Sequence, residues 1–82
     1  MTFERALAVI EAVMREGART HAGDWRTLPA AFHIAHATRH LELLAAADRS
    51  EPHLAHAATR LLMALELARE PDGPISAAPT AR

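Results

Sequence analysis

The sequence predicts an all-α fold, a small three-helix bundle. Three observations predict it: alanine is the dominant residue, half of the chain is apolar, and apolar side chains recur at spacings of three and four. Alanine has the highest helix propensity, and that spacing places side chains on one helical face. Eighty-two residues make one small domain with little area to bury. We therefore expect homo-oligomerisation to complete a larger bundle.

The first helix is expected over about residues 2–19, with Thr2 as its N-cap. Its apolar stripe has spacings of four, three and four, through Phe3, Leu7, Ile10 and Met14. Gly17 and Gly23 are expected to mark its end.

The second and third helices are expected over about residues 28–47 and 51–70. Thr27 and Ser50 are the expected caps, and Pro29 and Pro52 fit the first turns. The third helix has a predicted main apolar stripe of Leu54, Leu61 and Leu65, together with Ala57, Ala58 and Ala68. Residues 1–70 thus form the predicted helical domain. Residues 71–82 are rich in Pro, Ala, Ser and Thr, which predicts a flexible C-terminal tail.

Charge and composition exclude several classes of protein. The net charge is −1, so no basic surface for a nucleic-acid polymer or an anionic membrane is expected. The chain has no cysteine, which excludes disulfides and thiolate metal sites. No apolar run reaches the length of a membrane span, and charged residues interrupt the first apolar stretch, unlike in a signal peptide. We expect a soluble, cytoplasmic protein.

Histidine is the most informative residue type. Five of the six histidines fall into two clusters with helical spacing: His33, His36 and His40, then His53 and His56. On a helical wheel the first cluster occupies a narrow arc within the apolar face, so its rings should point between helices. The short turn before residue 51 predicts antiparallel neighbours, with His40 approaching His53 or His56.

Two interpretations of these rings remain open. Half-buried imidazoles can hydrogen-bond to one another and to nearby acids, and so fix the helix register. Alternatively, His36, His40, His53 and His56 are ligands of a divalent metal ion, because imidazole suits transition metals.

Several segments occur in an order that carries a family resemblance. The segment Glu16-Gly17-Ala18-Arg19-Thr20-His21 precedes Gly23-Asp24-Trp25-Arg26, and then come Ala37-Thr38-Arg39-His40-Leu41, Asp48 and Pro52-His53-Leu54-Ala55-His56-Ala57. This order resembles the N-terminal domain of phage and bacterial dATP/dGTP diphosphohydrolases over most of residues 3–68. The family implies an all-α fold related to the MazG-like nucleotide pyrophosphohydrolases. It also implies a divalent metal (Mg, Mn or Zn) and cleavage of a purine deoxynucleoside triphosphate to monophosphate and pyrophosphate.

Carried over by position, the resemblance makes Trp25, Arg26 and Arg39 substrate-binding residues and adds Asp48 to the metal site. Bidentate arginines hold phosphate oxygens, and tryptophan can stack on a base. The structural alternative is that Trp25 packs at a bundle end while the two arginines pair with nearby acids.

The sequence departs from the family pattern. His21 stands where Tyr is usual, and Asp24 where Asn is usual. The carboxylate cluster of MazG-like enzymes, Glu-Glu-x-x-Glu followed by Glu-x-x-Asp, is missing. Two functions follow: a metal-dependent pyrophosphohydrolase-like domain acting on dATP or dGTP, or a catalytically inactive oligomerisation or partner-binding module with a structural histidine network. A third is a histidine-rich metal binder or pH-responsive bundle.

Overall fold

Three helices form the described part of the chain, which comprises residues 2–20 and 24–68 of a computed structural model. They are α1 (Glu4–Thr20), α2 (Ala30–Ala45) and α3 (His53–Leu67), with a short 3-10 helix η1 (Trp25–Thr27) before α2. No strand occurs within these residues, so the all-α prediction is confirmed. The predicted tail, residues 71–82, lies outside the described residues, as does His21.

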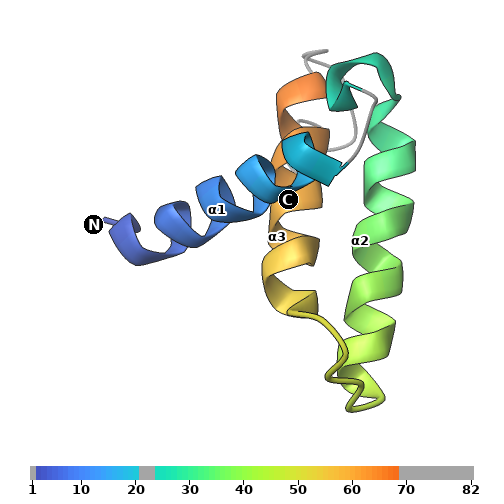
Figure 1. Ribbon diagram of the computed structural model, residues 1–82. Coiled ribbons are helices and arrows are strands. Elements are labelled where there is room, and N and C mark those ends of the chain that lie inside the picture. Colours follow the sequence, from blue (N-terminus) through green and yellow to red (C-terminus); the bar gives the residue numbers. More distant parts are fainter. Residues whose placement is uncertain (1, 21–23, 69–82) are drawn as a thin grey trace, which may run out of the picture.

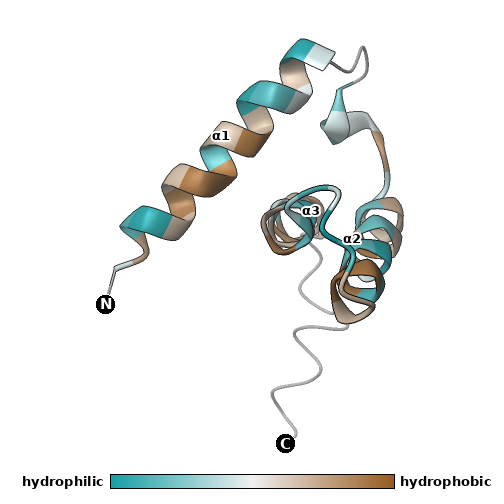
Figure 2. Cartoon of the chain, turned by 60° about the horizontal axis from the view of Figure 1, so that its bottom comes forward, coloured by the Kyte–Doolittle hydropathy of each residue, from teal (hydrophilic) through white to brown (hydrophobic). Residues whose placement is uncertain are grey.

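Helices α2 and α3 form an antiparallel hairpin (Figure 1). Among the helices of the described part, α1 contacts only α3. Its N-terminal half extends away from the hairpin in both ribbon views (Figures 1 and 2). The hairpin is therefore the structural unit that positions the histidines.

The predicted cap of α2 is wrong. Leu28 is extended (φ −100°, ψ 147°), because a residue before proline is pushed out of the helical region. The helix consequently begins after Pro29, which has no side-chain cap bond. Thr27 belongs to η1 instead, where its hydroxyl donates to the Asp24 carbonyl at 2.7 Å.

Ser50 does not cap α3 either. That helix begins after Pro52, again without a side-chain cap bond. The Ser50 hydroxyl donates to the Asp48 carboxylate at 2.6 Å, so it stabilises the connecting turn rather than the helix.

Helix α2 ends in a Schellman motif. The Asp48 N–H donates to the Leu43 carbonyl at 3.0 Å and the Ala47 N–H to the Leu44 carbonyl at 2.9 Å. Ala47 occupies the left-handed position, with φ 63°, where glycine is usual. This tight reversal turns Asp48 back toward the hairpin.

Gly17 does not end α1, which continues to Thr20. A Cβ added at Gly17 would meet nothing within 4 Å, so no neighbouring backbone requires a glycine there. An isolated glycine lowers helix stability without terminating the helix when its φ and ψ stay helical.

Histidine, arginine and alanine form the contact between α2 and α3. On α2 the inward positions follow a spacing of three, four and three: Ala30, His33, Ala37 and His40. On α3 they follow four, three and four: His53, Ala57, Arg60 and Ala64. His40 contacts His53 and His33 contacts Arg60, so this antiparallel register places Ala37 and Ala57 between the two polar pairs. We call these eight residues the seam.

The leucines of the predicted α3 stripe do not face the core, although its Ala57 does. Leu54, Leu61 and Leu65 are 63%, 46% and 54% exposed, whereas Ala57 and Ala64 are buried. Small alanines let the two helices approach closely, and leucines at the seam would hold them apart. The apolar surface left outside also includes Ile34 and Leu41 on α2, and Figure 2 shows brown, hydrophobic residues along α1 as well.

Homo-oligomerisation stays a prediction. Within residues 2–20 and 24–68, no helix combines the length and apolar character that crossing a bilayer requires.

Candidate functional site

Two imidazoles meet where the hairpin turns. His40, on α2, and His53, the first residue of α3, approach with their Nδ1 atoms 3.0 Å apart. The expectation that His40 lies next to His53 or His56 is confirmed for both, because the His40 ring is also 5.0 Å from that of His56, centroid to centroid. Rings from two helices therefore converge at one end of the seam.

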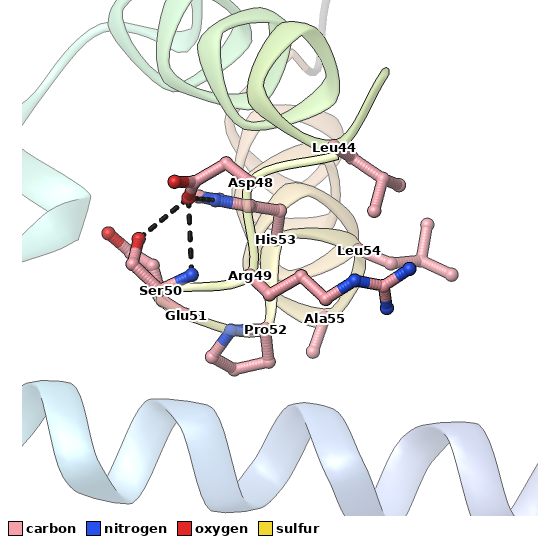
Figure 3. A pocket seen from close by; sticks show the side chains of 9 residues that line it. All are labelled: Leu44, Asp48, Arg49, Ser50, Glu51, Pro52, His53, Leu54 and Ala55. Carbon is pink, nitrogen blue, oxygen red and sulfur yellow. Dashed lines mark hydrogen bonds and ion pairs between the residues drawn. The ribbon is translucent and has the colours of Figure 1, made fainter. Parts of the chain in front are cut away.

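Asp48 orients His53. Its carboxylate accepts a 2.5 Å hydrogen bond from Nε2 of that ring, as well as bonds from the Ser50 N–H and hydroxyl (Figure 3). The hydrogen bonds from His53 and Ser50 lower the pKa of the Asp48 carboxyl to about 2, so it is ionised at neutral pH. Since Nε2 of a neutral His53 carries the proton given to Asp48, its Nδ1 has a free lone pair that faces His40.

His40 is uncharged at neutral pH. Burial lowers the pKa of its imidazole, the nearby His56 lowers it further, and Glu51 opposes both effects. Its Nδ1–H donates to the lone pair of His53, which leaves Nε2 of His40 without a proton. Neutral imidazole is the form that ligates metal ions.

Glu51 completes a possible ligand group. His40, Glu51 and His53 each offer one ligand atom, and these atoms lie within 4.8 Å of one another. The Glu51 side chain is 45% exposed and accepts a 2.8 Å hydrogen bond from Nδ1 of His56. Two donors on one ion with bonds of about 2.0–2.1 Å lie at most about 4 Å apart. The two Nδ1 atoms, 3.0 Å apart, meet that limit, and a metal ion there would displace the proton that His40 Nδ1 donates to His53.

The donor set fits a transition metal. Two imidazoles and one carboxylate occur together at catalytic zinc centres that keep an open coordination position. Magnesium favours oxygen ligands, so it fits this group less well. Asp48 would then be the outer carboxylate that fixes the orientation of a ligating histidine.

The turn also lines an open pocket of about 440 Å³. In Figure 3, Leu44 and Leu54 lie on the side of the turn opposite to the Asp48 carboxylate, and the Arg49 side chain extends toward them. The pocket therefore has a polar wall at Asp48 and His53 and an apolar wall at the two leucines.

A second polar pair lies further along the seam. His33 is fully buried, with its Nε2–H donating to the Trp25 carbonyl at 3.0 Å and its Nδ1 accepting from Arg60 at 2.9 Å. Both ring nitrogens are thus satisfied, which makes His33 a structural histidine that ties η1 and α3 to α2. The structural interpretation of the rings holds for this member.

The remaining predicted residues lie elsewhere. His36 is exposed, 4.3 Å from the ring of Phe32, and is not part of the ligand group. Its exposure differs from the inward position that the helical wheel predicted.

The residues that the resemblance assigns to substrate lie on two surfaces. Arg26 stacks on Trp25 at 4.6 Å and lies 3.6 Å from the Asp24 carboxylate. Arg39 is 69% exposed on α2 and lies 3.7 Å from Glu42. Because η1 precedes α2, Trp25 and Arg26 are at the opposite end of the hairpin from the His40–His53 pair (Figure 1).

Sequence reasoning missed Glu51 and Arg60. Glu51 lies two residues before His53, outside any helical spacing, so only the geometry of the turn brings it to the rings. Arg60 follows His53 by seven residues, and this heptad spacing was the available signal.

Comparison with family models decides the relationship. The model described as dATP/dGTP diphosphohydrolase, N-terminal, matches residues 1–74. The chain belongs to this family. No curated protein and no solved structure matches it. As a dATP/dGTP diphosphohydrolase N-terminal domain, it presents the His40–His53 pair within an all-helical hairpin.

Proposed function

We propose that this domain binds a divalent transition metal through His40, Glu51 and His53, and that it does so in the cleavage of dATP or dGTP to monophosphate and pyrophosphate. The observation that supports this most is the approach of two Nδ1 atoms to 3.0 Å with a carboxylate beside them. Family membership supports dATP or dGTP as the nucleotide.

Each residue has a distinct task in this proposal. His40 and His53 contribute neutral nitrogen ligands, and Glu51 contributes an oxygen and a negative charge. Asp48 holds the proton of His53 on Nε2, so the Nδ1 lone pair of His53 faces His40 and would pass to a metal ion that displaces the proton between the two rings. A bound metal would neutralise phosphate charge and activate water.

A second candidate function has its own support. The sequence lacks the MazG-like carboxylate cluster, and both ring nitrogens of His33 are satisfied by structural hydrogen bonds to Trp25 and Arg60. Both features suit a catalytically inactive module that uses its histidines for register. The two functions differ in whether the His40–His53 pair binds metal at all.

Calorimetric titration of the metal-free protein with Zn²⁺ and Mn²⁺ distinguishes them. His40→Asn removes one ligand and should abolish tight binding. Asp48→Asn should weaken binding about 10–100-fold, because it removes the group that orients His53. Glu51→Gln tests the carboxylate, and Glu42→Gln, on the exposed face of α2, is its matched control.

Release of pyrophosphate from dATP and dGTP with the bound metal is the second measurement. Loss of both metal and turnover in His40→Asn supports the first function. Wild-type protein that binds neither Zn²⁺ nor Mn²⁺ contradicts it and leaves the inactive module. In the metal titration, His36→Asn should bind Zn²⁺ and Mn²⁺ as the wild-type protein does, since its ring lies outside the ligand group.

A further inference from the structure

The guanidinium of Arg60 has positive charge that no carboxylate neutralises within residues 2–20 and 24–68. No Asp or Glu in this part of the chain lies within 4.0 Å of it, whereas Arg19, Arg26 and Arg39 each have an acidic neighbour. Arg5, Arg15 and Arg49 also lack such a neighbour there, but they are exposed, whereas Arg60 is half-buried. Burial lowers the pKa of Arg60, and no nearby acid offsets that effect. A half-buried guanidinium without a carboxylate partner can bind an anion from solution.

Only part of its hydrogen-bonding capacity is used. Arg60 donates to His33 Nδ1 at 2.9 Å, and a guanidinium has five N–H donors. The group also lies over the ring of Phe32, with its Cζ 5.7 Å from the centroid, which holds the planar group in place. A fixed guanidinium with free donors is a good binder of phosphate oxygens.

His36 places a second possible donor next to the same ring. It is exposed and lies 4.3 Å from the Phe32 centroid. Its pKa is lowered by burial, then by the positive charges of Arg60 and His33, and no acid acts on it in the opposite direction. His36 and Arg60 thus both lie against the ring of Phe32, and within residues 2–20 and 24–68 no carboxylate lies within 4.0 Å of either side chain.

The position relative to the proposed metal site suits a nucleotide. His33 and Arg60 occupy the seam seven residues from His40 and His53, or about 10 Å along the helix axis. The phosphate chain of a nucleotide carries several charges and can contact more than one group. We propose that Arg60 and His36 form a phosphate-binding site for the part of that chain which a metal at His40, Glu51 and His53 does not hold. This assignment rests on the proposed function for its ligand, but its residues are separate from the metal ligands.

The test is calorimetric titration of the full chain with inorganic pyrophosphate, first without metal and then with Mn²⁺. Arg60→Gln removes the charge and keeps an N–H for His33, so it preserves the seam. We expect it to weaken metal-free pyrophosphate binding about tenfold or more, the value of a hydrogen bond to a charged group. Arg60→Lys keeps the charge and should retain most of the affinity. His36→Gln should have a smaller effect in the same direction.

Arg5→Gln is the control for net charge, because Arg5 lies in the first turn of α1, which extends away from the hairpin. Equal losses in Arg5→Gln and Arg60→Gln would show a non-specific charge effect and overturn the site. A loss confined to Arg39→Gln would place phosphate on the outer face of α2 and overturn it too. Circular dichroism verifies that each variant is folded.

The two proposals fail differently. Pyrophosphate that binds only when Mn²⁺ is present, and equally well to Arg60→Gln, contradicts the phosphate site and leaves the metal site standing. Pyrophosphate that binds without metal to a protein that takes up no Zn²⁺ or Mn²⁺ supports the phosphate site and contradicts the proposed function. In the supporting case, pyrophosphate also moves the ring resonances of His36 and leaves those of His53 unchanged.

Discussion

The two faces of α3 have opposite compositions. The seam face carries His53, Ala57, Arg60 and Ala64. The residue that follows each of these in the sequence belongs to an outer stripe, which consists of Leu54, Ala58, Leu61 and Leu65. The bulky apolar residues are exposed, and the small and polar ones are buried or half-buried. Burial here follows close helix approach and polar pairing instead of hydrophobicity alone.

The polar pairs on the seam face give the hairpin a unique register. An alanine-only seam would pack nearly as well after a shift of one layer. The pairs His40–His53 and His33–Arg60 form only in the observed register, and a shift leaves buried polar groups without partners. Side chains proposed to bind metal and phosphate, His40, His53 and Arg60, thus also specify the helix register.

The largest effect is expected from Ala57→Leu. Ala57 is 1% exposed and lies between the His40–His53 and His33–Arg60 pairs. A larger side chain at this position would force α2 and α3 apart. We expect a loss of about 3 kcal/mol in the free energy of unfolding, the upper end for overpacking. Urea denaturation at one fixed protein concentration measures it.

Ala35→Leu on the exposed face of α2 is the matched control and should change the free energy of unfolding by less than about 0.5 kcal/mol. Similar losses at the two positions would mean that the seam is not the close contact between the helices.

The sequence predicts the helices well and their orientation poorly. Alanine content and apolar spacing are enough to place three helices between turn residues. However, residues 53, 57, 60 and 64 and residues 54, 58, 61 and 65 have the same four–three–four spacing. Hydrophobicity favours the second set, and the partner helix selects the first.

The site has the same limit. Helical spacing predicts that His40 meets His53, because both lie on regular helices joined by a short turn. It does not predict Glu51, whose position depends on the left-handed Ala47 and on the bonds between Ser50 and Asp48. Turn geometry of this kind is not encoded in a periodic pattern.

The second prediction concerns the deeper polar pair. His33→Leu removes the acceptor of Arg60 and the donor to the Trp25 carbonyl, and we expect a cost of about 2 kcal/mol. In a double-mutant cycle with Arg60→Met, the two changes should be non-additive, with a coupling of about 1.5–3 kcal/mol. Denaturation of the four proteins gives the coupling, and simple additivity would contradict a direct bond.

The third prediction is that the free energy of unfolding depends on pH through His36, His40 and Asp48. The pKa values of His36 and His40 are lowered in the folded state, so that state binds fewer protons than the unfolded chain. The free energy of unfolding should therefore decrease as the pH falls below the ordinary histidine value of 6.5. The Asp48 carboxyl, with a pKa lowered from 3.8 to about 2, adds a second decrease across that lower interval.

Urea denaturation across both pH intervals measures the two decreases. The double variant His36→Gln and His40→Gln should lose the upper one and keep the lower, whereas Asp48→Asn should do the reverse. If the free energy of unfolding of the double variant still decreases below pH 6.5, groups other than His36 and His40 cause that decrease.

The smallest intrinsic effect is expected on the outer face. Leu61 is 46% exposed, so Leu61→Gln should cost no more than about 1 kcal/mol within a single chain, roughly half of the value for a fully buried leucine. In the predicted homo-oligomer the cost of Leu61→Gln would be higher, because a second copy would cover the same side chain.

Sedimentation of the wild-type and Leu61→Gln proteins separates the cost within one chain from the cost at a contact between copies. If the wild-type protein assembles and Leu61→Gln dissociates it, the leucine stripe forms the contact between copies. An assembly that tolerates the substitution would place the contact on another surface, and the small cost within the chain would then be the whole effect.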